Sequence, residues 1–540
     1  MHFPRCRRGP ALFASPRKVT NGHLMDAFSA LQARAGFTCI EIRNHGGVKM
    51  LENLRPTPVF RFFEEICAIP HGSGNTKGIS DYLVKFAKER SLSYIQDEHN
   101  NVIIKKPATP GYEDAPVIIL QGHMDMVCEK EEDCNFDFLA DGLRLEVDGD
   151  FVTAKGTTLG GDDGIAVAYE LAILDSDDVD HPELECVFTV DEEIGLLGAA
   201  AMDTSVLKGR TLINIDSEME GILTVSCAGG ETVVSDFPVK RHKPDGSRSY
   251  ALLKVDGLLG GHSGEEINKE HGNAIKLLSR ILNEACHKTD IDICSIYGGL
   301  KDNAIPFMCS CELMASDDEY GELVAIVKKY NKIYKNEFSV SDPGVSVKIK
   351  RLDASNVTHR EPIDRDDFLN ALFFLYVVPN GVQAMSTDIK GLVETSLSMG
   401  ILSTGEDCVS VTNSVRSSVN SRKYALADQV AAIAKRAGGS SRLQGDYTPW
   451  EYKRNSKLRD LMVDVYSETF GKEIIVTAIH GGLECGVFSD KIPDLDCVSF
   501  GPDLFDIHTA NERMSISSVR RTYNYLLEVL KRTTELSEEG

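Results

Sequence analysis

The sequence predicts an α/β protein in which a mostly parallel central sheet, flanked by helices, is interrupted by an inserted α+β domain. Short apolar runs alternate with helical segments such as 165–174, which is typical of strands buried on both faces. After residue 227 the pattern changes to longer alternating strands and two long helices, at 276–287 and 320–335. A chain of 540 residues also exceeds the usual size of one hydrophobic core.

The first 49 residues differ in composition from the rest of the chain. They contain eight Lys and Arg against two Asp and Glu, whereas the whole chain has 58 against 82. We expect residues 1–49 to be an extension outside the fold that is disordered or not native. Two explanations stay open: translation from a start codon upstream of a natural beginning at Met50, and an Arg-rich segment for organelle targeting.

The first part of the α/β domain is expected at 50–227. Two helices begin it, because apolar residues repeat at helical spacing around Phe60 and Phe63 and again around Ile79 and Leu83. Four apolar strands are then expected at 101–105, 116–120, 186–190 and 211–215. We therefore expect the core of the sheet to come from this part of the chain.

The inserted domain is expected at 228–446 and the second part of the α/β domain at 447–540. A strand-helix-strand pattern at 308–351 and again at 364–412 indicates that the insertion consists of two related halves. The chain returns to an α/β pattern with an apolar strand at 497–500. It ends in a helix with one apolar stripe, formed by Val519, Tyr523, Leu526 and Leu530.

Charge and hydropathy exclude several classes of partner. A net charge of -24 and a pI of about 5.1 would repel a phosphate backbone or an anionic membrane surface, so we expect no nucleic acid and no membrane as partners. Apolar runs such as 371–378 are too short to cross a bilayer. The fourteen cysteines show no C-x-x-C repeat, which indicates reduced thiols in a cytoplasmic protein, unless residues 1–49 direct it to an organelle.

Carboxylates and imidazoles follow the predicted strands or occupy a Gly-rich turn. In an open α/β sheet, ligands bind at the carboxyl ends of the strands, so these positions indicate a site. The residues are His123 and Asp125 after 116–120, Asp162 in the turn TTLGGDDGIA, Asp191, Glu192 and Glu193 after 186–190, Asp216 after 211–215, and His508 after 497–500.

Each of these signals is weak alone, because a lone His-x-Asp is usually a loop histidine and a run of acids is usually a solvated turn. Together they match what a pair of divalent cations needs, namely nitrogen and oxygen ligands with one carboxylate shared between the ions. So many carboxylates on one rim would also repel one another without a cation. The sequence therefore predicts a site for two metal ions.

The residues also carry a family resemblance. GHMDMV, TTLGGDDGIA, TVDEEIG and NIDSE occur in the order and spacing of the di-zinc exopeptidases, and the chain resembles the aminoacyl-histidine dipeptidase family, also called Xaa-His or cytosolic non-specific dipeptidases. GGHSGEEI, NAIP, TNSVRSSVNS and HGGLECG are similar to that family too. The resemblance covers about residues 50–532 and implies a catalytic domain formed by 50–227 and 447–540, with a lid and dimerisation domain at 228–446.

The resemblance implies a role for each residue at the strand ends. The implied ligands are His123 and Asp216 for one metal ion, Glu193 and His508 for the other, and Asp162 as the bridge. Asp125 would orient His123, and Glu192 would be the general base. The chemistry agrees, since a carboxylate beside the ligands can take the proton of a metal-activated water. Two divalent ions per subunit are expected, zinc first, with cobalt or manganese as alternatives.

The resemblance also implies groups that bind the substrate. His262 on the lid would donate a hydrogen bond to the oxyanion. Such a histidine comes from the partner subunit in some relatives, which implies a homodimer and leaves its source open here. Arg416 and Asn303 would bind the terminal carboxylate, for which the planar guanidinium is suited. His480 and Glu484 would line the same pocket, with Glu484 at the amino end.

The sequence therefore predicts an enzyme, a metallodipeptidase that hydrolyses the amide bond of dipeptides of Xaa-His type or with broad specificity. A tripeptidase or an N-acyl-amino-acid deacylase on the same scaffold is an alternative, and recognition of the free amino end separates these activities. A metal-binding scaffold protein without catalysis is an alternative of another class. The presence of Glu192 argues against that class, because a general base has no evident use in a structural site.

Overall fold

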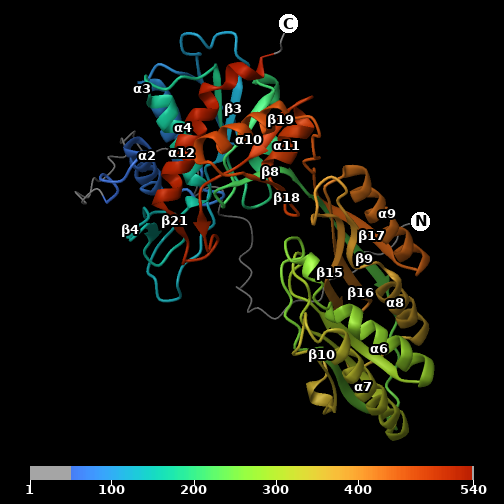
Figure 1. Cartoon of the computed structure of the whole chain (residues 1–540). Helices are drawn as coiled ribbons and strands as arrows, with labels where there is room; N and C mark the ends of the chain where they lie inside the picture. Colours follow the sequence, from blue (N-terminus) through green and yellow to red (C-terminus); the bar gives the residue numbers. More distant parts are fainter. Residues whose placement is uncertain (1–49, 538–540) are drawn as a thin grey trace, which may run out of the picture.

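The computed structural model describes residues 50–537, which form two large sheets and one small sheet with helices packed around them (Figure 1). The eight-stranded sheet lies in the upper part of Figure 1 and the nine-stranded sheet in the lower right part. The extension expected at 1–49 lies outside the described residues. In the part of the chain that is described, no helix is both long and apolar enough to cross a membrane.

The eight-stranded sheet is built from both ends of the described chain. Its strands in spatial order are β1 (Ser93–Gln96), β2 (Val102–Lys106), β6 (Leu184–Thr189), β3 (Ile118–His123), β7 (Thr211–Asn214), β19 (Asp496–Ser499), β8 (Ile222–Cys227) and β18 (Ile475–Ile479). The central strands β6, β3, β7 and β19 run parallel, so their carboxyl ends lie at one edge. The four expected strands are present, but β2 pairs antiparallel with both neighbours, and β8 pairs antiparallel with β19. The mostly parallel order thus holds only for the centre of the sheet.

Helices cover both faces of this sheet. Ile118 and Leu120 of β3 pack into the core that contains α2, α3, α4, α10 and α12, while Ile119 packs with α5 and α11 on the other face. The bounds are α2 (Thr57–Cys67), α3 (Lys77–Glu89), α4 (Gly161–Asp175), α5 (Leu197–Ala201), α10 (Lys457–Phe470), α11 (Glu484–Lys491) and α12 (Ile516–Lys531). The whole of β3 and β6 is buried, as strands covered on both faces require.

The nine-stranded sheet is antiparallel throughout. Its strands are β9 (Gly229–Pro238), β10 (Ser249–Asp256), β11 (Asp292–Gly298), β12 (Cys309–Ala315), β13 (Ser346–Arg351), β14 (Gly381–Met385), β15 (Val393–Thr404), β16 (Cys408–Ser417) and β17 (Ser440–Tyr447). Figure 1 shows its four helices on one side of the sheet: α6 (Ala274–Lys288), α7 (Asp317–Glu337), α8 (Arg365–Val377) and α9 (Asn420–Arg436). An antiparallel sheet with helices on one side is the α+β arrangement that the sequence predicts.

This sheet consists of two halves with the same order of elements. One βαββαβ unit is β10, α6, β11, β12, α7 and β13, in the spatial order β13-β10-β12-β11. The other unit is β9, α8, β15, β16, α9 and β17, in the order β15-β16-β9-β17, and the units meet where β11 pairs with β15. The halves expected at 308–351 and 364–412 therefore have other bounds, because β9 precedes the whole of the first unit in the sequence.

A small four-stranded sheet was not expected from the sequence. It contains β20 (Leu504–Phe505), β21 (Arg513–Ser515), β5 (Phe151–Ala154) and β4 (Leu145–Asp148), in that order. The described 3-10 turns are η1 (Thr204–Val206), η2 (Ile267–Lys269), η3 (Ala354–Asn356) and η4 (Thr533–Leu536). Pairing of β21 with β5 anchors the loop 506–512 to a distant part of the chain.

Candidate active site

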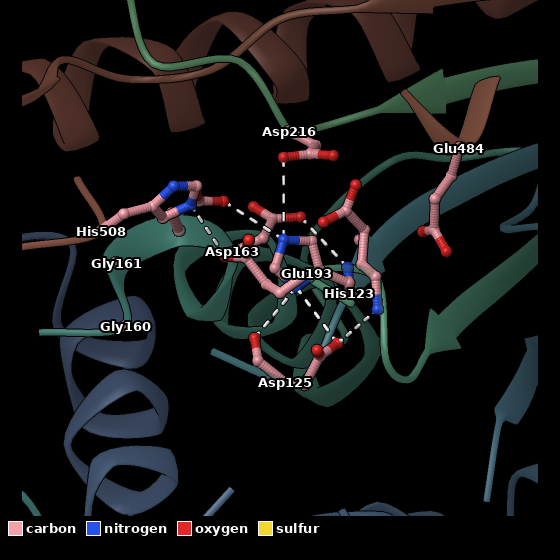
Figure 2. Close-up of polar contacts among 12 residues, drawn as sticks. His123, Asp125, Gly160, Gly161, Asp163, Glu193, Asp216, Glu484 and His508 are labelled. Carbon is pink, nitrogen blue, oxygen red and sulfur yellow. Dashed lines mark hydrogen bonds and ion pairs between the residues drawn. The ribbon is translucent and has the colours of Figure 1, made fainter. Parts of the chain in front are cut away.

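Three neighbouring parallel strands end at the candidate site. His123 is the last residue of β3, Glu192 and Glu193 follow β6, and Asp216 follows β7. Because β3 pairs with β6 on one side and with β7 on the other, the loops after these strands leave the sheet at the same edge. Figure 2 shows the side chains of His123, Glu193 and Asp216 gathered around one space.

Asp162 lies between the two imidazoles of the site. It belongs to the first turn of α4 and comes shortly after Gly160, whose φ of 65° is left-handed and suits a glycine. Oδ1 of Asp162 lies 3.2 Å from Nε2 of His123, and Oδ2 lies 3.1 Å from Nε2 of His508. One carboxylate thus faces both imidazoles, as a bridging ligand must.

His508 reaches the site from the small sheet. The sequence places it after the strand at 497–500, but in the structure it lies in the loop between β20 and β21. Its φ of 59° is left-handed, which is uncommon for a residue with a side chain. Nε2 of His508 lies 3.0 Å from Oε1 of Glu193. A tight loop on the small sheet therefore positions this imidazole.

Two sets of three side chains have the geometry of metal sites. In each set the potential ligand atoms all lie within 4.8 Å of one another. The sets are His123, Asp162 and Asp216 on one side, and Asp162, Glu193 and His508 on the other. They share Asp162, and together they contain the five side chains expected as ligands. A third set joins His123 to Glu192 and Glu193.

The electrostatics of these groups fit a pair of divalent cations. Burial and the acids nearby raise the pKa of Asp216, and burial raises the pKa of Glu192 to about 8. Hydrogen bonds with Asp162 and Glu193 raise the pKa of His508 to about 10. Acids that are crowded and buried in this way bind protons unless another positive charge is present. Nitrogen and oxygen donors of these types suit zinc and similar ions, so the residues present fit two such ions.

Asp125 supports both His123 and the loop that carries Glu192. Nδ1 of His123 lies 2.9 Å from the backbone oxygen of Asp125 and 3.5 Å from its Oδ1. The Asp125 carboxylate accepts hydrogen bonds from the backbone N–H of Glu192 at 3.1 Å and from the hydroxyl of Ser73 at 2.8 Å. Ser73 was not predicted, because a single serine in a Gly-rich loop gives no signal of its own.

A second group of side chains, which we call the lid group, consists of His262, Arg416 and His480. They surround Gly264, where a Cβ would lie 3.1 Å from Cε1 of His262, 3.3 Å from Cζ of Arg416 and 2.7 Å from the backbone oxygen of His480. Nε2 of His480 lies 2.7 Å from the hydroxyl of Ser396 on β15. Burial, and then the charge of Arg416, lower the pKa of His480 to about 3, so this imidazole is neutral at neutral pH.

The guanidinium of Arg416 is hydrogen-bonded through Nη1, whereas its Nε has no hydrogen-bond partner. Nη1 donates its hydrogen bond to the hydroxyl of Tyr447 at 2.9 Å, and Nε is buried. The residue is only 8% exposed, so water does not readily compensate the missing partner. A guanidinium with unpaired donors is ready to bind an anion. Tyr447 was not predicted from the sequence.

Asn303 lies beside the lid group but contributes mainly through its backbone. The residue is exposed, and its backbone oxygen accepts a hydrogen bond from the N–H of Ser263 at 2.8 Å. A β-bridge joins the neighbouring Ala304 to His262. Asn303 thus holds the loop that carries His262.

Glu484 lies to one side of the candidate metal ligands, at the right in Figure 2, and is fully buried. Its Oε2 accepts hydrogen bonds from the amide of Gln121 at 2.6 Å and the hydroxyl of Thr189 at 2.5 Å, while its Oε1 has no partner. Burial raises the pKa of Glu484 to about 7. Among the described residues, no hydrogen bond joins the lid group directly to the metal-binding residues. The short segment from His480 to Glu484 links the lid group to Gln121 and Thr189, which bind Glu484.

Comparisons with proteins of known sequence agree with this geometry. Residues 119–532 match the model of peptidase family M20/M25/M40. The cytosol non-specific dipeptidase of Escherichia coli (strain K12) is 35% identical over 482 residues, which are 89% of this chain and 98% of that protein. The expected relationship to the aminoacyl-histidine dipeptidases is therefore confirmed.

Solved structures show the same relationship. The aminoacylhistidine dipeptidase from Vibrio alginolyticus is 34% identical and superimposes with a TM-score of 0.84 over 91% of this chain and 98% of that one. A tripeptidase from Staphylococcus aureus, 16% identical with a TM-score of 0.51 over 89% of this chain and 99% of that one, shares the fold alone. The expected α/β fold with a second α+β region is confirmed. The chain belongs to peptidase family M20/M25/M40.

Proposed function

We propose that this protein is a dipeptidase that holds two divalent metal ions and hydrolyses the amide bond of dipeptides, of Xaa-His type or with broad specificity. The observation that carries the proposal is the position of Glu192 beside two sets of metal-binding side chains that share Asp162. The family is one of peptidases, and two relatives that match nearly the whole chain are named dipeptidases.

In the proposed reaction some residues of the site hold the metal ions and another transfers the proton. Two bound divalent cations would polarise the scissile carbonyl and lower the pKa of an attacking water. The residues that would hold them are His123 and Asp216, Glu193 and His508, and Asp162 for both. Glu192 takes the proton of the attacking water and passes it to the leaving amine. Glu192 lies beside His123 and Glu193, where bound cations would hold its carboxyl group in the charged form that accepts a proton.

The lid group binds the carboxyl half of the substrate. Burial, and then the charge of Arg416, lower the pKa of His262, so its imidazole is neutral and able to donate a hydrogen bond to the oxyanion. Arg416 binds the terminal carboxylate through the unpaired side of its guanidinium. We assign Asn303 to the same end of the substrate, and His480 to the wall between the two ends. His262 lies beside Arg416 and His480 of its own chain, around Gly264.

The free amino end separates a dipeptidase from a deacylase. We assign this end to Glu484, whose Oε1 is buried without a hydrogen-bond partner. A buried carboxylate oxygen favours an ammonium group over an apolar acyl group, because only the ammonium compensates its desolvation. The tripeptidase, the N-acyl-amino-acid deacylase and the inactive scaffold are outcomes that the experiment below distinguishes.

Zinc is the metal we propose, because its borderline character suits imidazole and carboxylate ligands, with cobalt or manganese as alternatives. Segments 50–227 and 447–540 form the catalytic domain in this proposal. Residues 228–446 form the lid, through which two subunits pair as a homodimer, and light scattering of the purified protein tests that pairing. We place the protein in the cytoplasm, in line with the name of its relative from Escherichia coli.

The experiment measures hydrolysis of alanyl-histidine and β-alanyl-histidine by the Zn²⁺-loaded protein, beside their N-acetylated forms and alanyl-alanyl-histidine. Cleavage of the free dipeptides alone, abolished in Glu192→Gln, supports the proposal. Preference for the acetylated forms would make the protein a deacylase, and preference for the longer peptide a tripeptidase. No cleavage by a chain that holds two metal ions would leave the inactive scaffold as the correct reading.

A further inference from the structure

We propose that Glu512 is a positioning residue that holds the turn Leu159–Asp162 in the shape that lets Asp162 face both metal ions. The inference rests on the metal centre of the proposed function. It concerns a residue outside the three candidate metal sets, on a loop whose fold the sequence does not predict.

The hydrogen bonds of the Glu512 side chain are all made to the backbone of this turn. Its Oε2 accepts hydrogen bonds from the N–H groups of Leu159 at 2.7 Å and Gly160 at 3.0 Å. Its Oε1 accepts from the N–H groups of Gly161 at 2.8 Å and Asp162 at 3.4 Å. The residue is 3% exposed, so protein groups rather than water satisfy its carboxylate.

These four N–H groups need an acceptor that the turn itself does not supply. Gly161 and Asp162 begin α4 and Leu159 and Gly160 directly precede it, and the first N–H groups of a helix have no partner within the helix. The residue at the cap position is Gly160, which has no side chain, and no side chain of the turn caps the helix. Buried N–H groups without an acceptor would destabilise this conformation. Glu512 supplies the acceptor from another part of the chain.

The carboxylate of Asp162 points away from the backbone that Glu512 binds. Asp162 lies two positions after the cap residue Gly160, at a point of α4 where its φ and ψ are not helical. With the N–H groups of residues 159–162 bound to Glu512, both oxygens of Asp162 point toward Nε2 of His123 and Nε2 of His508. Figure 2 shows Gly160 and Gly161 in the turn beside His508. The orientation of the bridging ligand therefore depends on a carboxylate that binds no metal.

The same loop carries His508, four residues before Glu512. The hydroxyl of Thr509 donates to the backbone oxygen of Asp506 at 2.7 Å, and the N–H of Glu512 donates to the backbone oxygen of Thr509 at 3.2 Å. These bonds make the segment from Asp506 to Glu512 one compact unit. When Glu512 binds the turn of Asp162, it also sets the distance between Asp162 and His508, one ligand of the second metal set.

The test compares Zn²⁺ binding by the full chain and by Glu512→Gln, in competition with a chromophoric chelator. The amide keeps the size of the side chain but offers one oxygen, so one pair of N–H groups faces an NH₂ group. We expect binding of Zn²⁺ to weaken about 10- to 100-fold, as for other residues that orient ligands. We also expect kcat to fall while KM changes little, because the substrate-binding groups are untouched. Glu512→Asp, which keeps both oxygens, is expected to lie between the two.

Asp150→Asn is the matched control. Asp150 accepts hydrogen bonds from the hydroxyls of Ser515 and Ser517, both at 2.7 Å, and from the N–H of Ser517 at 3.0 Å, close to the same loop but away from the turn. This variant should lose thermal stability without a change in Zn²⁺ affinity. Equal losses of affinity in Asp150→Asn and Glu512→Gln would mean that Glu512 acts only on stability, and would overturn the proposal.

Hydrogen exchange of the metal-free protein is the second readout. The amides of residues 159–162 should exchange faster in Glu512→Gln than in the unchanged chain, and this result does not depend on metal. Unchanged exchange together with unchanged Zn²⁺ affinity would refute the role of Glu512. An unchanged chain that binds no Zn²⁺ would instead refute the proposed metal centre, and with it the purpose of the positioning.

Discussion

Replacement of Arg416 by lysine should weaken dipeptide binding while the chemical step is largely preserved. The guanidinium uses Nη1 for Tyr447 and keeps Nε buried without a partner, so the edge formed by Nε and Nη2 is available for the two oxygens of a carboxylate. Lysine offers a point charge and cannot make the paired contact. Losing one charge-assisted hydrogen bond costs about 1.5–3 kcal/mol, so KM should rise about 10- to 150-fold with a smaller change in kcat.

The assay uses two substrates that differ only at the carboxyl end. kcat/KM is measured for alanyl-histidine and for its C-terminal carboxamide, with the unchanged protein and with Arg416→Lys. If Arg416 binds the carboxylate, the unchanged protein prefers the acid, and the variant loses that preference by about the factor by which KM rises. Tyr447→Phe is the control, because it removes the hydroxyl that holds Nη1 and leaves the guanidinium in place. Its effect should be only severalfold.

The reasoning would be refuted if the variant kept the full preference for the acid over the carboxamide. The carboxylate would then be bound by another group, and Arg416 would serve only to hold the lid group together. An equal rise in KM for both substrates would lead to the same conclusion, since a contact to the carboxylate cannot affect a substrate that lacks one.

Three further predictions follow from the same contacts. Glu192→Gln should lower kcat about 10²- to 10⁴-fold with both metal ions retained, because only proton transfer is lost; steady-state kinetics with metal analysis check this, and an active variant contradicts the role. Ser73→Ala removes the hydrogen bond of 2.8 Å to Asp125 and should weaken Zn²⁺ binding about tenfold in a chelator competition, whereas unchanged affinity would contradict the support we assign to it. Glu484→Gln should alter the pH dependence of stability in the metal-free protein. Burial raises the pKa of Glu484 from 4.5 to about 7, so stability that is complete below pH 4.5 is lost as the pH rises toward 7, by about 3 kcal/mol. Urea unfolding at pH 5 and pH 8 should show a loss of stability that is larger by this amount in the unchanged chain than in Glu484→Gln, because the other buried acids titrate in both, and parallel curves would disprove it.

The strands that hold the site could be predicted because burial on both faces leaves a mark in the sequence. All six residues of β3 and all six of β6 are buried, so both strands are nearly free of charge. Whether a strand runs parallel or antiparallel to its neighbour cannot be read from the same apolar pattern. β2 is equally apolar in its first half and yet pairs antiparallel with β6, because an apolar run is compatible with either direction. The bounds of the two halves of the nine-stranded sheet were missed for another reason, since β9 is separated in sequence from the unit it completes.

The side chains of the candidate metal sets could be predicted to lie together because residue type and position agree. An imidazole or carboxylate directly after a buried strand is unusual enough that several together indicate a site. The supporting residues give no such signal. Ser73 and Glu512 act on a neighbouring carboxylate or backbone, and the place of Glu512 depends on strands of two and three residues that pair with a segment far away in the sequence. Pairing between such short and distant strands produces no periodic pattern in the local sequence that would predict it.

The short segment from His480 to Glu484 gives a physical reason for a preference for short substrates. Nε2 of His480 is bound to Ser396 on the nine-stranded sheet, and Oε2 of Glu484 is bound to Gln121 on the eight-stranded sheet. The five residues 480–484 thus join the wall of the pocket at the carboxyl end to the group we assign to the amino end. On these assignments one short segment holds the two ends of the substrate at a fixed separation, as specificity for a dipeptide requires, which is why we favour a dipeptidase over a tripeptidase on the same fold.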